Sequence, residues 1–332
     1  MDVDDYDYDL PAGSIAQVPI EPRSAARLLD GLDPGQPPLD RTVAELPELL
    51  GPGDVVVVNE TKVLPARLHL RKHSGGAAEV LLLEPLGDDR WQALVRPGRR
   101  LPPGTPLFAP GDHRRVAPVV EVGDRLDDGR RVVRLLGDPE THGETPLPPY
   151  IQTPLTDAGR YQTVYARIPG SVAAPTAGLH FTSEVLDRIR VRGASVHTVD
   201  LAVGLDTFRP IASGQVEDHV MHTERYSVPE STMAACDAAS RVIAIGTTCV
   251  RALESVAARG ELEGRTDLFI TPGFEFRVVD VLLTNFHLPR SSLLLLLAAF
   301  CGDRWRDLYA TALERGYRFL SFGDAMLVGR GR

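Results

Sequence analysis

The amino-acid sequence predicts an α/β protein that carries a small, inserted all-β domain. Residues 54–59 include four consecutive valines, which is typical of a strand buried on both faces. From residue 182 onwards, strand-like and helix-like segments alternate, as they do in mainly parallel α/β layers and barrels. Between these regions, residues 61–150 are rich in Pro, Gly and short apolar alternations and show no long helical pattern, which predicts an all-β unit.

These patterns divide the chain into a discontinuous α/β main domain, residues 1–60 and 151–332, and an inserted all-β domain, residues 61–150. In the main domain we expect helices over residues 182–192, 229–241, 249–259, 291–301 and 303–315. Its expected strands cover residues 54–59, 195–203, 242–245, 268–271, 277–283 and 317–322. In the insert, apolar runs predict strands at residues 79–83, 91–95 and 131–136, and a stiff proline-rich linker follows at residues 146–150.

The composition is that of an ordinary globular protein, with 332 residues of which 43% are hydrophobic and 24% are charged. The longest apolar run, residues 293–301, is too short to span a bilayer, and the acidic residues 1–5 do not resemble a signal peptide. Three widely spaced cysteines, Cys236, Cys249 and Cys301, argue against a disulfide framework or a zinc site. We therefore expect a cytoplasmic protein that does not associate with membranes.

The net charge of −9 argues against a general nucleic-acid binder. The acidic excess lies in the main domain, whereas the insert carries slightly more basic than acidic residues. Its arginines, among them Arg96, Arg99 and Arg100, form either a solvated surface or a surface that contacts phosphate groups.

The first candidate site is the junction Gly246-Thr247-Thr248, between an expected strand and an expected helix. Backbone N–H groups and the positive end of the helix dipole favour a carboxylate or a phosphate at such a junction. Arg251 and Glu254 are three residues apart and share one face of this helix. An ordinary capped helix with a surface ion pair is the alternative interpretation.

Three further clusters combine polar and small residues near element boundaries. Residues 173–182 place His180 beside a helix start, and residues 284–289 place Asn285 and His287 at a strand end. Residues 321–326 place Asp324 after the expected last strand. Such histidines serve either in acid–base chemistry or as structural hydrogen-bonding groups.

Other site classes are not supported by the sequence. His219 and His222 lie close to Glu224, but no third and fourth ligands follow at plausible spacing, so we expect no metal site. No GxSxG, P-loop or GxGxxG motif occurs, which argues against the usual serine hydrolases, P-loop NTPases and dinucleotide-binding enzymes.

Motifs spread over the whole chain resemble those of one family. The matching runs are residues 6–11, 15–17, 54–67, 146–151, 160–166, 172–182, 222–226, 245–255, 271–274, 283–289 and 317–327. By these motifs the chain resembles the S-adenosylmethionine:tRNA ribosyltransferase-isomerases, which form epoxyqueuosine in queuosine biosynthesis.

The resemblance implies an α/β-barrel main domain with an inserted Greek-key β-barrel. It also implies a reaction without metal and without any cofactor beyond S-adenosylmethionine as co-substrate. The ribosyl moiety of S-adenosylmethionine moves to 7-aminomethyl-7-deazaguanine in the tRNA anticodon, and adenine and methionine are released. Such a site needs acid–base groups, a clamp for the methionine carboxylate and aromatic rings near the sulfonium.

The resemblance also suggests roles for individual residues. We expect acid–base roles for His180, His287, Asp324 and Asp206. The expected substrate-binding residues are Thr176, Phe181, Thr182, Asp200, Glu224, Arg225, Thr247, Thr248, Arg251, Asn285 and Phe286. Of these, Thr247, Thr248 and Arg251 are expected to hold the methionine carboxylate, and Phe181 or Phe286 to face the sulfonium. The expected tRNA contacts are Arg96, Arg99 and Arg100.

One loop departs from the family pattern. Asp200, Ala202 and Asp206 stand where the family typically has Thr, His and Gly, so the loop loses an imidazole and gains two carboxylates. A carboxylate there could hold or deprotonate the amine of the acceptor. Two alternatives stay open: an S-adenosylmethionine enzyme that acts on a small molecule, and a non-catalytic RNA-binding relative.

Overall fold

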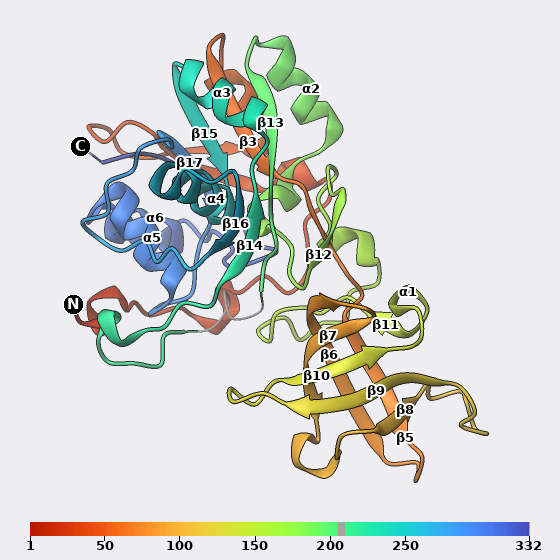
Figure 1. Ribbon diagram of the computed structural model, residues 1–332. Helices are drawn as coiled ribbons and strands as arrows, with labels where there is room; N and C mark the ends of the chain where they lie inside the picture. Colours follow the sequence, from red (N-terminus) through yellow and green to blue (C-terminus); the bar gives the residue numbers. More distant parts are fainter. Residues whose placement is uncertain (205–209, 332) are drawn as a thin grey trace. The chain divides into compact units, whose positions relative to one another are not determined.

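The computed structural model describes residues 1–204 and 210–331, and the chain divides into two compact units (Figure 1). The main unit comprises Met1–Thr61, Pro149–Ile168 and Ala174–Arg332, and the inserted unit comprises Lys62–Pro148 and Pro169–Ala173. The short segment 169–173, which we expected in the main domain, therefore packs with the inserted unit. The bounds of independently folding domains stay a prediction.

The main unit is built on one hydrogen-bonded series of strands. They are β1 (Arg27–Gly31), β2 (Leu39–Thr42), β3 (Asp54–Asn59), β13 (Ser195–Leu201), β14 (Glu224–Ser227), β15 (Arg241–Ile245), β16 (Glu263–Thr266), β17 (Val281–Asn285) and β18 (Ala325–Gly329). Their spatial order is β16-β14-β13-β3-β15-β17-β18-β1-β2. The central strands β13, β3, β15 and β17 are parallel, whereas β18 runs antiparallel to β17.

Helices cover the sheet. They are α2 (Ser183–Val191), α3 (Glu230–Ala238), α4 (Thr247–Arg259), α5 (Ser292–Cys301) and α6 (Arg304–Glu314). Alternate residues of β3, β15, β17 and β18 pack in one core cluster with α2 and the 3-10 helix η4 (Val43–Leu49). Helix α4 contacts β13, β3, β15 and β17, and α5 packs beside α6 (Figure 1). Because the central strands are covered, every residue of β3 is buried, as its valine run predicted.

The inserted unit contains a closed antiparallel barrel. Its strands and helices are β4 (Thr61–Val63), β5 (Arg67–Lys72), β6 (Ala77–Gly87), β7 (Arg90–Arg96), η5 (Gly98–Arg100), β8 (Thr105–Phe108), β9 (Pro118–Arg125), β10 (Arg131–Leu135), α1 (Pro139–His142), β11 (Gly143–Glu144) and β12 (Ile168–Ser171). The order β5-β6-β7-β10-β9-β8 closes through a β5–β8 pairing. Because β8, β9 and β10 are neighbours in sequence while β7 pairs with β10, the topology contains a Greek key.

All five helices expected from the sequence are present, but two expected strands are wrong. Residues 268–271 form no strand, because the polar segment β16 makes the pairing with β14 while Ile270 is buried in a loop. Residues 317–322 also form no strand. Leu320 adopts a φ of 68° and its carbonyl accepts from Gly323 N–H, so this segment is a turn, and the last strand begins at Ala325.

The α/β class and the all-β insert expected from the sequence are present in the structure. The nine strands of the main unit have β16 and β2 at their edges, and no pairing joins these two strands within residues 1–204 and 210–331. Closure into an α/β barrel therefore stays a prediction. Across the same residues, no helix combines the length and apolar character needed to cross a membrane.

The parallel strands bring polar residues to one edge of the sheet. Strands β13, β3, β15 and β17 all end there, and β18 begins there because it is antiparallel to β17. Asn59, Gly246, Asn285 and Asp324 therefore lie along this edge. The carboxyl ends of parallel strands are the usual binding edge of α/β sheets.

Candidate functional site

Two pockets at this edge share the lining residues Thr176, Asn285, His287 and Leu293. One, of about 320 Å³, we call the apolar pocket, and its other lining residues are Tyr150, Phe286, Leu288, Ser291, Leu320 and Ser321. The other, of about 330 Å³, we call the threonine pocket. Its other lining residues are Ala174, Pro175, Ala177, Val203, Gly246, Thr247, Thr248 and Thr284. No Asp, Glu, Lys or Arg side chain lines either pocket in the part of the chain that the structure describes.

The N-terminus of α4 forms one wall of the threonine pocket. Gly246, with a φ of 90°, ends β15 and turns the chain directly into the helix. The N–H groups of the first helical residues, Thr247 and Thr248, have no acceptor within the helix. Thr248 is 7% exposed, and its Oγ1 is buried without a hydrogen-bond partner. This wall therefore offers donors to an anion.

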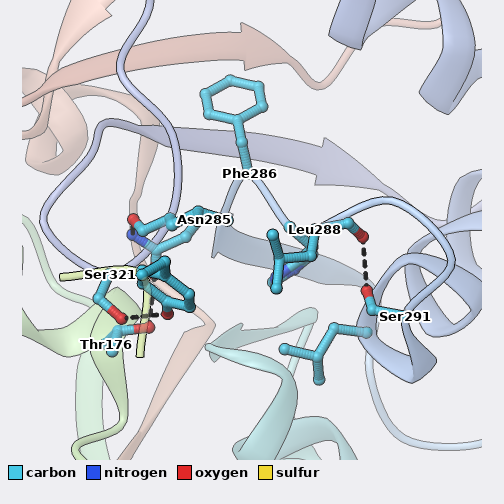
Figure 2. Close-up of a pocket in the computed structure, with 10 residues that line it drawn as sticks. Thr176, Asn285, Phe286, Leu288, Ser291 and Ser321 are labelled. Carbon is cyan, nitrogen blue, oxygen red and sulfur yellow. Dashed lines mark hydrogen bonds between the residues drawn. The ribbon is translucent and has the colours of Figure 1, made fainter. Parts of the chain in front are cut away.

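The side chain of Asn285 connects three segments of the main unit between the two pockets. Its Oδ1 accepts from Thr176 Oγ1 at 2.9 Å, and its Nδ2 donates to the carbonyl of Leu320 at 3.2 Å. Nδ2 also lies 3.2 Å from His180 Nε2. Figure 2 shows Asn285, Thr176 and Ser321 gathered on one side of the apolar pocket.

These contacts fix the tautomer of His180. A backbone carbonyl only accepts, so Leu320 O determines which end of the Asn285 amide is the NH₂ group. The same NH₂ group faces His180 Nε2, which must then accept, so the proton of the neutral ring lies on Nδ1. Burial lowers the pKa of His180 to about 4, against the opposing effect of Asp324. His180 is therefore a neutral hydrogen-bonding group whose Nε2 is occupied.

His287 lines both pockets, and its contacts do not determine which ring nitrogen carries the proton. Its Nε2 lies 2.9 Å from Thr284 Oγ1, a hydroxyl that can either donate or accept. Its main chain is held by hydrogen bonds to the hydroxyls of Tyr8 and Tyr309. Burial lowers the pKa of His287 to about 3, so the ring is neutral at pH 7. Either tautomer is compatible with this geometry, so His287 is the better placed of the two imidazoles to exchange a proton.

The two phenylalanines proposed to face a sulfonium have their rings elsewhere. Phe181 is fully buried in the core cluster beneath the sheet and lines neither pocket. Phe286 lines the apolar pocket, but its ring stacks on Phe319 with centroids 4.7 Å apart, and Figure 2 shows it pointing away from Asn285. The aromatic side chain that sequence reasoning missed is Tyr150, whose hydroxyl is 2.7 Å from Ser321 Oγ. Its one signal was the motif at residues 146–151.

The charged candidates Arg251 and Glu224 form an ion pair with each other, and neither lines the two pockets. Arg251 is 5% exposed and pairs with Glu224, and its Nε donates to the carbonyl of Leu268. Glu224 also accepts from Gly204 N–H, which ties β14 to the end of β13. The structure thus places Arg251 and Glu224 in a buried ion pair rather than in the proposed carboxylate clamp.

Two further carboxylates, Asp324 and Asp200, also lie outside the lining of both pockets. Asp324, 1% exposed, accepts from the main-chain N–H groups of Arg27 and Arg318 and pairs with the Arg318 guanidinium. This organises the turn before β18 and leaves no oxygen in either pocket. Asp200 is 2% exposed and forms an ion pair with Arg225 at 2.8 Å, but neither of its buried oxygens accepts a hydrogen bond. Asp206 lies outside the described residues.

The remaining candidates have distinct positions. Thr182 caps α2 by accepting from Val185 N–H at 3.3 Å. In the inserted unit, the exposed Arg96 ends β7, and Arg99 and Arg100 belong to η5. The buried Arg131 donates to the carbonyls of Gly98 and Leu101 and so fixes this turn.

The buried imidazoles predict a specific pH dependence of stability. The pKa values of His180 and His287 in the folded protein lie below the ordinary value, so the unfolded chain binds more protons below about pH 6.5. The free energy of unfolding should therefore fall as the pH decreases from about 6.5 to about 4. The expected slope is up to about 1.4 kcal/mol per pH unit for each imidazole.

Chemical denaturation at a series of pH values measures this dependence. His180→Gln and His287→Gln should each reduce the slope, whereas His197→Gln, which removes a partly exposed imidazole from the same unit, should leave it unchanged. An equal slope in all four proteins would contradict buried, neutral imidazoles.

Comparison with known proteins gives a consistent result. A sequence model of the family described as "Queuosine biosynthesis protein" matches residues 3–328. The S-adenosylmethionine:tRNA ribosyltransferase-isomerase of Rubrobacter xylanophilus is 52% identical, over 100% of this chain and 99% of its own. The protein of the same name from Thermus thermophilus is 50% identical, over 97% of this chain and 98% of its own.

A solved structure is also similar. The crystal structure of an S-adenosylmethionine tRNA ribosyltransferase from Thermotoga maritima matches with a TM-score of 0.55 and 37% identity, over 97% of this chain and 99% of its own. Because the similarity extends over nearly the full length of the chain and of its relatives, the protein belongs to the queuosine biosynthesis family of S-adenosylmethionine:tRNA ribosyltransferase-isomerases.

Proposed function

We propose that this protein transfers and isomerises the ribosyl moiety of S-adenosylmethionine onto 7-aminomethyl-7-deazaguanine in a tRNA anticodon. The products are epoxyqueuosine in the tRNA, adenine and methionine. The observation that carries the proposal is the similarity of about 50% over the full length to relatives that bear this name. The joined pockets at the ends of β15 and β17 supply a site of suitable chemistry.

In this proposal, the two chemically different ends of S-adenosylmethionine occupy the two pockets. The methionine carboxylate would bind at the N-terminus of α4, where Thr247 and Thr248 offer backbone N–H groups and hydroxyls. Adenine would occupy the apolar pocket beside Leu288, Leu320 and Tyr150. Arg251 is paired with Glu224 and lines neither pocket, so the clamp that we propose does not use it.

The neutral lining suits the chemistry of a sulfonium. The positive sulfur acidifies the adjacent 5′ hydrogens, so a neutral base can remove one and start the expulsion of adenine. We assign this role to His287 because it is the imidazole that lines both pockets. The amine of the acceptor base then attacks the sugar fragment, and the epoxide closes as methionine leaves. The proposed reaction uses no cofactor beyond S-adenosylmethionine as co-substrate.

The tRNA would contact a second surface. Arg96, Arg99 and Arg100 lie at or near η5 of the inserted unit, where they can contact backbone phosphates. A tRNA substrate also implies that the protein works in the cytoplasm.

The direct test is an incubation of the purified protein with S-adenosylmethionine and tRNA that carries 7-aminomethyl-7-deazaguanine. Release of adenine and formation of epoxyqueuosine should both occur, and the same tRNA with unmodified guanine should give neither product. Equal release of adenine without tRNA would point to a small-molecule acceptor. Absence of adenine under every condition would point to a non-catalytic RNA-binding relative.

Thr284 provides a test of the role of His287. Thr284→Val keeps the shape of this buried side chain but removes the hydroxyl that holds His287 Nε2, so kcat should fall about tenfold or more. Thr284→Ser keeps the hydroxyl and should stay within about threefold of the wild-type kcat.

The two variants differ in a way that packing alone does not explain. Melting temperatures of both variants check that the fold is retained. If Thr284→Ser loses as much kcat as Thr284→Val, the hydroxyl does not act through His287 and the assignment of the base fails.

A further inference from the structure

A third pocket in the main unit encloses about 230 Å³, a volume that includes open solvent, and two arginines are among its polar lining side chains. Its polar lining residues are Arg23, Arg160, His180 and Ser321, and the rest of the lining is Pro19, Ile20, Leu179 and Phe322. No carboxylate lines it in the ranges 1–204 and 210–331. Ser321 also lines the apolar pocket, so the two cavities meet at this residue.

Arg160 is held at this pocket with unused donors. Its side chain is 12% exposed, and Nη2 donates to the carbonyl of Ile20 at 2.7 Å. Its Nε and Nη1 are buried and make no hydrogen bond of acceptable geometry. Nε touches Glu21 Oε1, a carboxylate that is 66% exposed. A buried guanidinium of this kind is under-satisfied, which favours an added anion.

A second guanidinium lies close to the first. Arg23 donates to the carbonyls of Gln162, Leu179 and Gly159, which fixes its position. Burial lowers the pKa of Arg23 and the positive charge of Arg160 lowers it further, while the carboxylates of Glu21 and Asp157 partly oppose this shift. An anion between the two would relieve this repulsion.

His180 adds an N–H donor to the residues that line this pocket. Its Nε2 accepts from Asn285, so its remaining ring nitrogen, Nδ1, carries the proton. A neutral N–H donor beside two guanidiniums is the donor set found where proteins bind phosphate oxygens.

We propose that the pocket formed by Arg23, Arg160, His180 and Ser321 binds a phosphate group of the RNA backbone next to the nucleotide that is modified. The inference rests on the proposed function. The methionine carboxylate of S-adenosylmethionine is the other anion available, but the α4 N-terminus already accommodates it in the threonine pocket. Because Ser321 lines both pockets, a phosphate bound here would lie close to the apolar pocket, to which we assign the adenine of S-adenosylmethionine.

Glu21 acts as an internal competitor in this proposal. Its exposed carboxylate contacts Arg160 in the absence of RNA and moves away when the phosphate binds. Removing the charge of Glu21 should therefore strengthen RNA binding, whereas removing the charge of Arg160 should weaken it.

The test uses the full-length protein and an anticodon stem-loop RNA that carries 7-aminomethyl-7-deazaguanine. Arg160→Gln should weaken RNA binding about tenfold and reduce the slope of log K against log salt by about 0.7–0.9, the value for one phosphate contact. Glu21→Gln should tighten binding several-fold. The matched controls Arg190→Gln and Asp187→Asn alter an exposed ion pair on α2 and should change neither affinity nor slope.

The outcomes are separable. An unchanged salt slope in Arg160→Gln together with unchanged affinity in Glu21→Gln would overturn the phosphate site, while adenine release by the wild-type protein would still support the proposed function. An increase in KM for S-adenosylmethionine without a change in KM for RNA would assign the pocket to the methionine carboxylate and also overturn the proposal. If Arg160→Gln does not fold, Glu21→Gln alone decides.

Discussion

The hydrogen bonds of the Asn285 side chain are the constraint on which the site depends. Asn285 ends β17, and its amide reaches Thr176 and His180 of η7 (Thr176–His180) and the carbonyl of Leu320 before β18. Thr176 and His180 are more than 100 residues from Asn285 in the sequence. They meet it because the sheet brings η7 and the end of β17 to one edge. The amide thereby holds the wall between the pockets and determines which nitrogen of His180 carries a proton.

A second principle is the separation of charge from the reacting site. The buried carboxylates Glu224 and Asp324 are each paired with an arginine, and neither lines the joined pockets. Hydroxyls, an amide and the neutral imidazole of His287 line these pockets instead. For a cationic substrate that must lose a proton, such a lining avoids a permanent carboxylate that would stabilise the sulfonium ground state. In the proposed mechanism, proton transfer is assigned to His287, the imidazole that lines both pockets.

The sequence predicted the class of fold better than the limits of individual elements. The valine run of β3 and the small-residue turn into α4 are local signals, and both are present in the structure. Residues 317–322 were wrongly predicted as a strand because their aromatic residues are buried in the core from a turn. The positive φ of Leu320, which makes this turn, has no signal in the sequence. The edge strand β16 was not predicted because its residues are polar and give no apolar strand pattern.

The sequence also located the motifs of the candidate site more reliably than the roles of their residues. Asn285, His287, Thr247 and Thr248 line the pockets, because motifs at the ends of parallel strands converge. The sequence spacing alone could not show that Arg251, unlike these residues, does not line the pockets. Its position on α4 suited a clamp equally well, and only the side-chain contact with Glu224 shows that it is engaged elsewhere. Likewise, no local sequence pattern indicates that the Asp324 carboxylate accepts hydrogen bonds from the main-chain N–H groups of Arg27 and Arg318.

The most direct test of the central claim is the tautomer of His180, observed by nitrogen NMR of protein labelled with ¹⁵N-histidine. The His180→Gln variant assigns the signals. At pH 7 the account predicts a neutral ring with an unprotonated Nε2 and a protonated Nδ1, and it predicts that Asn285→Leu removes this preference. A protonated Nε2 in the wild-type protein, or a tautomer that does not respond to Asn285→Leu, would contradict the claim that the Asn285 amide sets the state of the site.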